Sequence, residues 1–325
     1  MYHIGVDLGG TNIAAGITDE SFHVIQKGSV PTLPDRGSGA VLHDLAELCL
    51  DLMRKSDLTV NDFPYLGIAA PGIANQSTGI IEYNNNLGFI QVPITRIMKE
   101  KLGFQEVYLE NDANAAALGE ALAGAGRGAD ISIMITLGTG VGGGVVIQGR
   151  LLQGAHHIGG ELGHIVIERR NGRRCTCGRI GCWEAYSSST ALVSRTKEMM
   201  QENTQSLMWN LCGGDLKRAD SKTAFTARKM GDRTASVLID EYMDDLACGL
   251  SNVINAFDPD VVCLGGGLSQ QGQILLDLLI PRVGRETYGY QENKNEREKK
   301  RVKLAELGNE AGWIGAAWLR ESRTK

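Results

Sequence analysis

Residues 2–17 read YHIGVDLGGTNIAAGI, and this stretch decides the fold class. Apolar side chains alternate with other residues over its first half, at Tyr2, Ile4, Val6 and Leu8. That spacing predicts a β-strand, because every second side chain of a strand lies on the same face. A glycine turn, Gly9-Gly10-Thr11, follows, and the apolar segments 13–17 and 22–30 predict two more strands. The stretch therefore predicts a three-stranded meander and not a strand that runs into a helix.

The same pattern returns in residues 131–147, which read ISIMITLGTGVGGGVVI. A predicted strand again ends in a glycine turn, Gly138-Thr139-Gly140, and a β-branched segment follows it. A third glycine turn, Gly265-Gly266-Gly267, follows a predicted strand over 261–264. We interpret the first two stretches as an internal duplication, with one half in each of two domains. A length of 325 residues is typical of two domains.

The rest of the chain alternates between predicted strands and helices, which indicates an α/β fold. Strands are predicted at residues 65–70 and 107–110, and helices at 41–53, 113–125, 190–200, 236–257 and 313–319. The charged stretch 291–301 predicts a solvated loop or helix face.

Composition restricts the classes of function. A net charge of −5 argues against nucleic-acid and membrane-surface partners, which favour clustered Lys and Arg. No signal peptide precedes the first strand, and no uncharged apolar run reaches the roughly 18 residues of a membrane span. Seven cysteines are an odd number, which does not fit a fully paired secreted framework. We therefore expect a cytoplasmic protein.

The three glycine turns are the first functional signal, because successive backbone N–H groups at such turns form an anion-binding concavity. The P-loop pattern is absent, since no Gly-Lys pair occurs in the chain. A dinucleotide fingerprint does occur at Gly138, Gly140 and Gly143, but it requires a helix after the turn and residues 144–147 predict a strand. Ordinary hairpin glycines are the alternative. We expect phosphate binding, with Asp7 holding the hydrated Mg²⁺ of a nucleotide.

A cysteine–histidine cluster is the second signal. His164, Cys175, Cys177 and Cys182 offer four ligands within nineteen residues, and the spacing C-x-C-x4-C differs from the common C-x2-C knuckle. Three thiolates and one imidazole suit a closed tetrahedral zinc site of the structural kind. A buried thiol cluster or a redox pair is the alternative, and we expect zinc.

A carboxylate at a strand-to-helix junction is the third signal. Glu110-Asn111-Asp112 lies where the strand over 107–110 gives way to the next helix. Asp112 could be a helix N-cap, or it could be the base that accepts the proton of an attacking hydroxyl group. The run Asn84-Asn85-Asn86 and Asn111 could bind a polyol or form turns. Glu161 and Glu184 flank the cysteine cluster, which could hold both carboxylates toward a sugar.

These pieces resemble one family, the bacterial repressor–ORF–kinase (ROK) family of sugar kinases and transcriptional repressors. The resemblance rests on DLGGT (7–11), LENDANA (109–115), LGTGVG (137–142), GELGH (160–164), CTCGRIGCWE (175–184) and LGGG (264–267). These motifs occur in order across nearly the whole chain, and the residues around Asp112 and over 182–190 look most like the glucokinases of the family. Asn12 stands where the family often has Lys or Arg, and Phe89 where an aromatic residue, often Trp, follows Asn-Leu.

The resemblance implies an actin-like ATPase (ribonuclease H-like) fold of two α/β domains, with ATP and sugar in the cleft between them. We place the small N-terminal domain at 1–118 plus about 308–325, and the large domain with the zinc loop at 119–307. The resemblance implies Asp112 as the base and a homodimer or homotetramer. It implies sugar contacts from Gly72, Asn86, Asn111, Asp112, Glu161, His164 and Glu184, with His164 shared between metal and sugar. The nucleotide is assigned to Asp7, Gly9, Gly10, Thr11, Asn12, Gly138, Thr139, Gly140, Gly265, Gly266 and Gly267.

We therefore expect transfer of the γ-phosphoryl group of ATP to the 6-hydroxyl of glucose, with Mg²⁺ and a structural Zn²⁺. The same chemistry on N-acetylglucosamine, N-acetylmannosamine, fructose or allose is the nearest alternative. A sugar-responsive repressor would need a helix-turn-helix domain before the first strand, which begins at Tyr2. A zinc-stabilised sugar-binding protein without turnover is the third reading.

Overall fold

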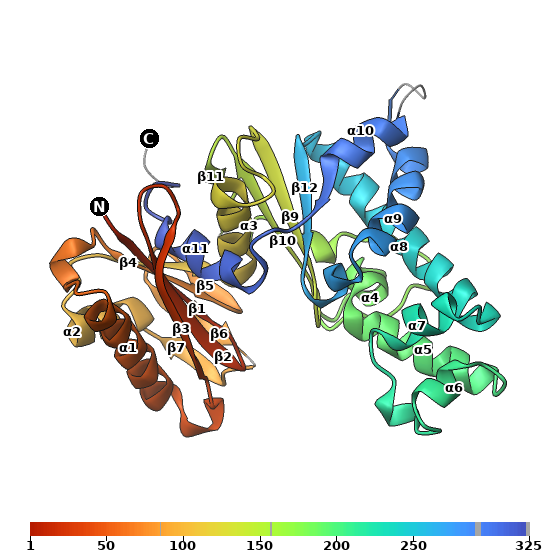
Figure 1. The fold of residues 1–325 in the computed structure, drawn as a ribbon, viewed down its shortest axis with the longest axis horizontal. Helices are drawn as coiled ribbons and strands as arrows, with labels where there is room; N and C mark the ends of the chain where they lie inside the picture. Colours follow the sequence, from red (N-terminus) through yellow and green to blue (C-terminus); the bar gives the residue numbers. More distant parts are fainter. Residues whose placement is uncertain (85, 157, 290–293, 323–325) are drawn as a thin grey trace. The chain divides into compact units, whose positions relative to one another are not determined.

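The computed structural model describes residues 1–84, 86–156, 158–289 and 294–322 (Figure 1). The chain forms two compact units. Unit 1 comprises Met1–Met134, Gly144–Gly160 and Ala305–Lys325, and unit 2 comprises Ile135–Gly143 and Glu161–Leu304.

Unit 1 thus includes residues 119–134 and 144–160, which the sequence assigned to the large domain. The side chain of Glu120 shows why residues beyond 118 stay with unit 1. Its carboxylate is fully buried and accepts hydrogen bonds from the backbone N–H of Leu307, at 2.7 Å, and of Glu306, at 3.1 Å. The predicted domain boundary stays a prediction.

The first sheet belongs to unit 1 and has the strand order β3-β2-β1-β4-β8. Its strands are β1 (His3–Leu8), β2 (Asn12–Thr18), β3 (Val24–Pro31), β4 (Leu66–Ala70) and β8 (Val107–Asn111). The first three form an antiparallel meander, as the sequence predicts. Strands β1, β4 and β8 run parallel, with Asp7 level with Ala69 and Ala70 level with Asn111. The carboxyl ends of these three strands therefore share one edge of the sheet, as residues on parallel strands in register must.

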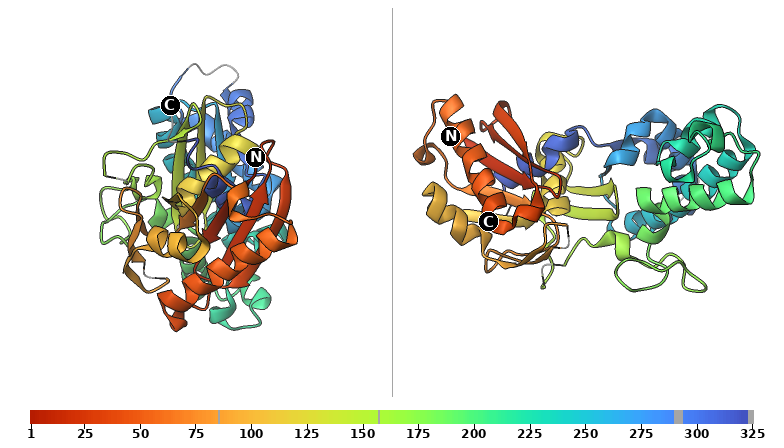
Figure 2. Two further views of the ribbon diagram at one scale, coloured as in Figure 1. Left: turned by 90° about the vertical axis from the view of Figure 1, so that its left-hand side faces the viewer. Right: turned by 90° about the horizontal axis from the view of Figure 1, so that it is seen from below.

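Helices cover both faces of this sheet. They are α1 (Ser38–Lys55), α2 (Ile94–Leu102), α3 (Asp112–Ala123) and α11 (Ala311–Ala317). Ile4 and Val6 share a hydrophobic core with α1, whereas the intervening Gly5 lies against Trp313 of α11. Alternation along β1 therefore places α1 and α11 on opposite faces. The first strands and α11 come from opposite ends of the sequence and lie side by side (Figures 1 and 2).

A small antiparallel sheet, which the sequence did not reveal, follows β4. It consists of β5 (Ile73–Asn75), β6 (Ile80–Asn84) and β7 (Phe89–Val92). These strands have only three to five residues, so no long alternating pattern marks them. Phe89 is buried in the core of unit 1.

The second sheet repeats the strand order of the first, as β11-β10-β9-β12-β13. Its strands are β9 (Ile131–Leu137), β10 (Val141–Ile147), β11 (Arg150–Leu151), β12 (Val261–Gly265) and β13 (Val302–Leu304). In each sheet, three strands that are consecutive in the sequence lie side by side in reverse order, and two strands from later in the chain lie next to the first of them. The strands β12 and β13 pair in parallel. The two sheets thus share a strand order, but residues of the second sheet fall in both units, and the duplication with one half in each domain stays a prediction. Because β10 continues to Ile147, the dinucleotide fingerprint is also excluded as the sequence predicted.

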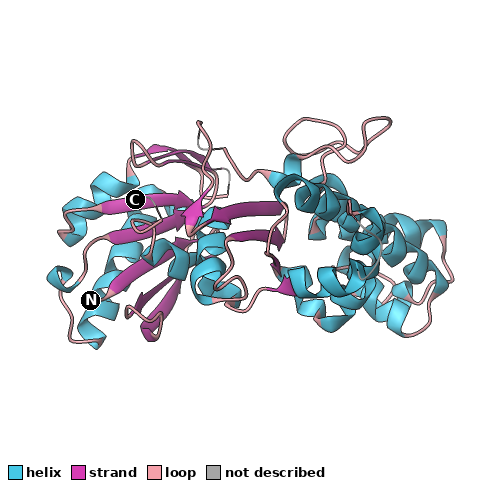
Figure 3. Ribbon diagram, turned by 90° about the horizontal axis from the view of Figure 1, so that it is seen from above, coloured by secondary structure: helices cyan, strands magenta, loops and turns pink. Residues whose placement is uncertain are grey.

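Unit 2 is mostly helical outside its strands (Figure 3). Its helices are α4 (Glu184–Ser187), α5 (Ser189–Glu202), α6 (Met208–Leu211), α7 (Thr223–Lys229), α8 (Arg233–Phe257), α9 (Gln273–Glu286) and α10 (Lys294–Arg301). In the described part of the chain, no helix is both long and apolar enough to cross a bilayer.

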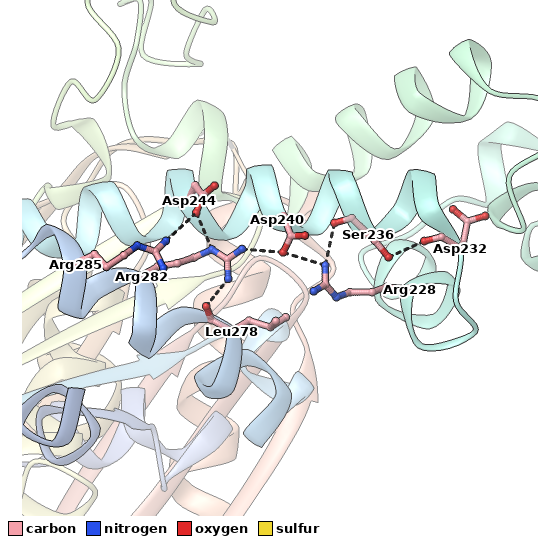
Figure 4. A network of polar contacts seen from close by, with 8 residues as sticks. All are labelled: Arg228, Asp232, Ser236, Asp240, Asp244, Leu278, Arg282 and Arg285. Carbon is pink, nitrogen blue, oxygen red and sulfur yellow. Dashed lines mark hydrogen bonds and ion pairs between the residues drawn. The ribbon is translucent and has the colours of Figure 1, made fainter. Parts of the chain in front are cut away.

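An ion-pair network joins three of these helices (Figure 4). Arg282 of α9 donates to the carboxylates of Asp240 and Asp244 on α8, each at 2.7 Å. Arg228 of α7 contacts the same Asp240 at 3.1 Å and donates to the carbonyl of Ser236 at 2.9 Å. Arg282 is mostly buried, whereas Asp240 and Asp244 are partly exposed to solvent. Because solvent weakens such ion pairs, the network adds little to the free energy of unfolding, and its main effect is to align α7 and α9 on α8.

Candidate active site

Two aspartates lie at the carboxyl edge of the first sheet. Asp7 stands near the end of β1, and Asp112 is the first residue of α3, directly after β8. Asp7 is tightly enclosed, because a Cβ at Gly312 of α11 would lie 2.3 Å from its carboxylate oxygen. Gly312 thus leaves the space that this carboxylate fills.

The electrostatics of the two carboxylates are coupled. Burial, and after it the negative charge of Asp112, raises the pKa of Asp7 to about 7. Burial also raises the pKa of Asp112, against hydrogen bonds from the Ala113 N–H and the Asn111 side chain that lower it. A pair of this kind can hold a divalent cation or take up a proton from a hydroxyl group, because both changes relieve the repulsion.

Asn111 is the N-cap of α3, and Asp112 Oδ1 also accepts from the N–H of Ala113 at 2.9 Å. The Asn111 side-chain oxygen accepts from the N–H of Ala113 at 2.9 Å and of Asn114 at 3.3 Å. Its amide nitrogen donates to the carbonyl of Gly72 at 3.4 Å. The N-cap role that was the alternative for Asp112 is therefore filled by Asn111.

Glu110, the residue before Asn111, holds this junction through hydrogen bonds, a role that the sequence did not assign to it. It is fully buried and accepts from Gln153 at 2.8 Å, from Asn114 at 3.2 Å and from Gln76. It also accepts from the backbone N–H of Asn111 at 3.0 Å. A buried carboxylate with this many donors fixes the strand end from which Asp112 projects.

The first glycine turn presents unpaired donors. Its backbone is closed by a hydrogen bond from the N–H of Gly9 to the carbonyl of Asn12, at 3.0 Å. Among the described residues, no partner is recorded for the N–H of Gly10 or Thr11. Adjacent free N–H groups at a tight turn are the arrangement that binds phosphate oxygens.

The second glycine turn, in unit 2, has the same property. The N–H of Gly138 donates to the carbonyl of Gly140 at 3.0 Å. No partner for the N–H of Thr139 or Gly140 is recorded within the described ranges. A Cβ at Gly140 would lie 2.3 Å from the Glu184 carboxylate, so the glycine leaves the space that this side chain occupies.

The third glycine turn ends β12. Gly265 is the last residue of the strand, and Gly266 has a φ of +82°, which favours glycine. A Cβ at Gly266 would also lie 2.6 Å from the carbonyl oxygen of Leu137, so this turn packs tightly on the end of β9. All three turns predicted from the sequence thus follow strands, as expected.

The cysteine–histidine cluster is assembled in unit 2. The ligand atoms of His164, Cys175, Cys177 and Cys182 all lie within 4.8 Å of one another. The Sγ atoms of Cys177 and Cys182 are 3.7 Å apart, and so are Cys175 Sγ and His164 Nδ1. Four ligands at Zn–S distances of about 2.3 Å in a tetrahedron would be about 3.8 Å apart. The donor set and its spacing therefore fit a structural zinc ion.

The carboxylates flanking the cluster lie in different surroundings. Glu184 is half-buried, and its two oxygens accept from Thr176 Oγ1 at 2.8 Å and from the N–H of Val141 at 3.1 Å. Glu161 is exposed and precedes the short turn that contains His164. A cavity of about 360 Å³ opens beside Glu184 and Thr139. Its wall includes Thr176, Thr190 and Arg195.

The remaining predicted sugar residues lie in unit 1. Asn86 is exposed, and its Cβ would be 3.3 Å from a Cβ placed on Gly10, so it borders the first glycine turn. Asn84 is instead the buried last residue of β6, and its side-chain oxygen accepts from the N–H of Leu87. Asn85 lies outside the described residues. Asn12 is exposed at the start of β2.

Unit 1 thus brings together Asp7, the first glycine turn, Asn86, Gly72, Asn111 and Asp112. Unit 2 brings together the metal ligands, Glu184 and the second glycine turn. Among these residues, Asp112 and Glu184 are the first residues of α3 and α4.

Comparison with known proteins identifies the class. The ROK family model matches residues 3–323. A glucokinase of Thermotoga maritima is 40% identical over 281 residues, covering 86% of each chain. The crystal structure of a ROK hexokinase from Thermus thermophilus has a TM-score of 0.84 at 34% identity and covers all of both chains.

A third relative is a ROK family glucokinase from Streptomyces griseus, solved in complex with glucose and AMPPNP. It has a TM-score of 0.79 at 32% identity, covering 99% of this chain and 100% of that one. The chain therefore belongs to the ROK family, and its fold is the actin-like ATPase fold that the sequence predicted.

Proposed function

We propose that this protein is an ATP-dependent hexose kinase that phosphorylates the 6-hydroxyl group of glucose. The observation that supports it most is that Asp7 and Asp112 lie at the same edge of the first sheet, where the charge of Asp112 acts on Asp7. The first glycine turn, with its free N–H groups, directly follows β1. The similarity to glucokinases, one of them bound to glucose and a nucleotide analogue, supports the same substrates.

In the proposed reaction, Asp112 accepts the proton of the attacking hydroxyl as its oxygen bonds to the γ-phosphorus of ATP. The bond from that phosphorus to the bridging oxygen breaks, and ADP leaves with the electron pair. The free N–H groups of the glycine turns bind phosphate oxygens. Asp7 would hold hydrated Mg²⁺, which neutralises phosphate charge.

The sugar contacts remain those inferred from the family motifs. Gly72, Asn86 and Asn111 would supply them from unit 1, and Glu161, His164 and Glu184 from unit 2. His164 can serve both metal and sugar, because its Nδ1 faces Cys175 and leaves Nε2 for a hydroxyl group. The zinc ion would stiffen the loop that carries these residues.

Other expectations belong to the same proposal. We propose that the protein acts in the cytoplasm, in carbohydrate metabolism, as a homodimer or homotetramer. Gly265, Gly266 and Gly267 would contribute to nucleotide binding, as would Asn12 next to the first turn. Size-exclusion chromatography with light scattering would measure the oligomeric state.

The substrate assignment is tested by initial rates with ATP and a panel of glucose, N-acetylglucosamine, N-acetylmannosamine, fructose and allose. We expect the highest kcat/KM for glucose, by tenfold or more over the N-acetyl sugars, and slow ATP hydrolysis without sugar. Turnover of an N-acetyl sugar alone would overturn the choice of glucose. A DNA mobility shift by the protein, with no turnover of any sugar, would favour the repressor reading.

A further inference from the structure

Two threonines that are not among the predicted site residues form hydrogen bonds to the first and second glycine turns. Thr32 follows β3, is fully buried, and donates from its hydroxyl to the carbonyl of Gly9 at 2.6 Å. Thr190 lies in the first turn of α5 and donates to the carbonyl of Thr139 at 2.8 Å. One is 23 residues from its partner and the other 51, so no local pattern announces them.

Backbone N–H groups of the same two segments donate to further carbonyls of the glycine turns. The N–H of Thr32 donates to the carbonyl of Thr11 at 2.8 Å, and the N–H of Ser189 donates to the carbonyl of Gly138 at 2.8 Å. Each of these two glycine turns is therefore held at its carbonyls by one threonine hydroxyl and one backbone N–H, which belongs to Thr32 itself at the first turn and to Ser189 at the second.

The geometry of the peptide bond means that these hydrogen bonds also set the direction of the neighbouring N–H groups. In a planar trans peptide, the carbonyl of one residue and the N–H of the next point in opposite directions. Holding the carbonyl of Gly9 therefore directs the N–H of Gly10 away from Thr32. Holding the carbonyls of Gly138 and Thr139 directs the N–H groups of Thr139 and Gly140 away from α5. These are N–H groups for which no partner is recorded in the described residues.

We propose that Thr32 and Thr190 are positioning residues that preorient the phosphate-binding N–H groups of the two turns. This inference rests on the proposed function, because it assumes that the turns bind the phosphates of ATP. Each hydroxyl would act through the turn carbonyl to which it donates. The peptide groups of a glycine turn can otherwise rotate. A carbonyl that is already held in place therefore reduces the conformational entropy that phosphate binding would cost.

The test compares Thr32→Val and Thr190→Val with Thr32→Ser and Thr190→Ser. Valine keeps the shape and loses the donor, whereas serine keeps the donor. Calorimetry should show ATP affinity reduced about tenfold in each valine variant, as expected for a lost hydrogen bond to a constrained group, and within about twofold of wild type in each serine variant. Adenosine affinity should not change. The KM for ATP should rise while the KM for glucose stays constant.

Several outcomes would overturn the inference. Valine variants that bind ATP as wild type does would overturn it, and so would variants that lose ATP and adenosine affinity equally. Thr190 is exposed, so its valine variant should fold even if the buried Thr32 variant does not, and it then decides the case for the second turn. A wild type that binds ATP yet phosphorylates no sugar would refute the proposed function while leaving this inference intact. A wild type that binds no ATP would refute both.

Discussion

Replacing Asp112 by asparagine should lower kcat by about 10²- to 10⁴-fold, with binding of ATP and glucose changed only a few-fold. Asparagine has nearly the same size and cannot accept the hydroxyl proton, and a positioned general base contributes rates of this order. The helix itself should survive, because Asn111 caps α3 and an asparagine at position 112 still offers an oxygen to the N–H of Ala113. Rapid-quench measurement of glucose 6-phosphate gives kcat, and calorimetry gives both affinities.

Asp7→Asn is the informative companion, because it should weaken the response to Mg²⁺ instead of removing the base. The pH profile of the wild type provides a second check. A carboxyl group with a raised pKa takes up its proton at higher pH, so kcat/KM should fall as the pH drops through about 7, where Asp7 titrates. Undiminished turnover by the Asp112→Asn variant would show that another group accepts the proton.

Cys182→Ser should abolish zinc binding and destabilise unit 2. We expect one zinc per chain in the wild type and much less than one in the variant, measured by atomic absorption. Structural zinc sites in small domains contribute about 10–16 kcal/mol of apparent binding free energy. A loss of only about 3 kcal/mol would lower the Tm by about 6–12 °C in a protein part of this size.

Cys248→Ser is the matched control, because Cys248 lies on α8 outside the metal cluster. It should keep full zinc content and nearly the wild-type Tm. The loop around the ligands explains the size of the expected effect, since Cys182 is fully buried and pairs with Val166 in an isolated bridge. A wild type purified without chelators that holds no zinc would refute the assignment, as would a Cys182→Ser variant with full occupancy.

Local sequence patterns were sufficient for much of the fold. The alternation in residues 2–8 predicted β1, and the repeated strand–turn–strand pattern predicted the strands on either side of the first and second glycine turns. Those features depend on neighbours along the chain, and the period of the side chains reveals them. The short strands β5 to β7 were missed because three to five residues are too few to show a period.

The candidate site was predictable only in part, and for a related reason. The glycine turns, the metal ligands and Asp112 are chemically conspicuous in the sequence. The groups that hold them in place are not, because Thr32, Thr190 and Glu110 act through hydrogen bonds to residues far along the chain. Such partners are decided by tertiary packing, so a threonine after a strand looks like any other until the fold is known.

A crystal structure with glucose and a non-hydrolysable ATP analogue tests the central claim most directly. The account predicts that a carboxylate oxygen of Asp112 lies within hydrogen-bonding distance of the sugar 6-hydroxyl, with the γ-phosphate on the other side of that oxygen. A complex in which the 6-hydroxyl contacts a different acidic side chain, and Asp112 touches neither ligand, would contradict it.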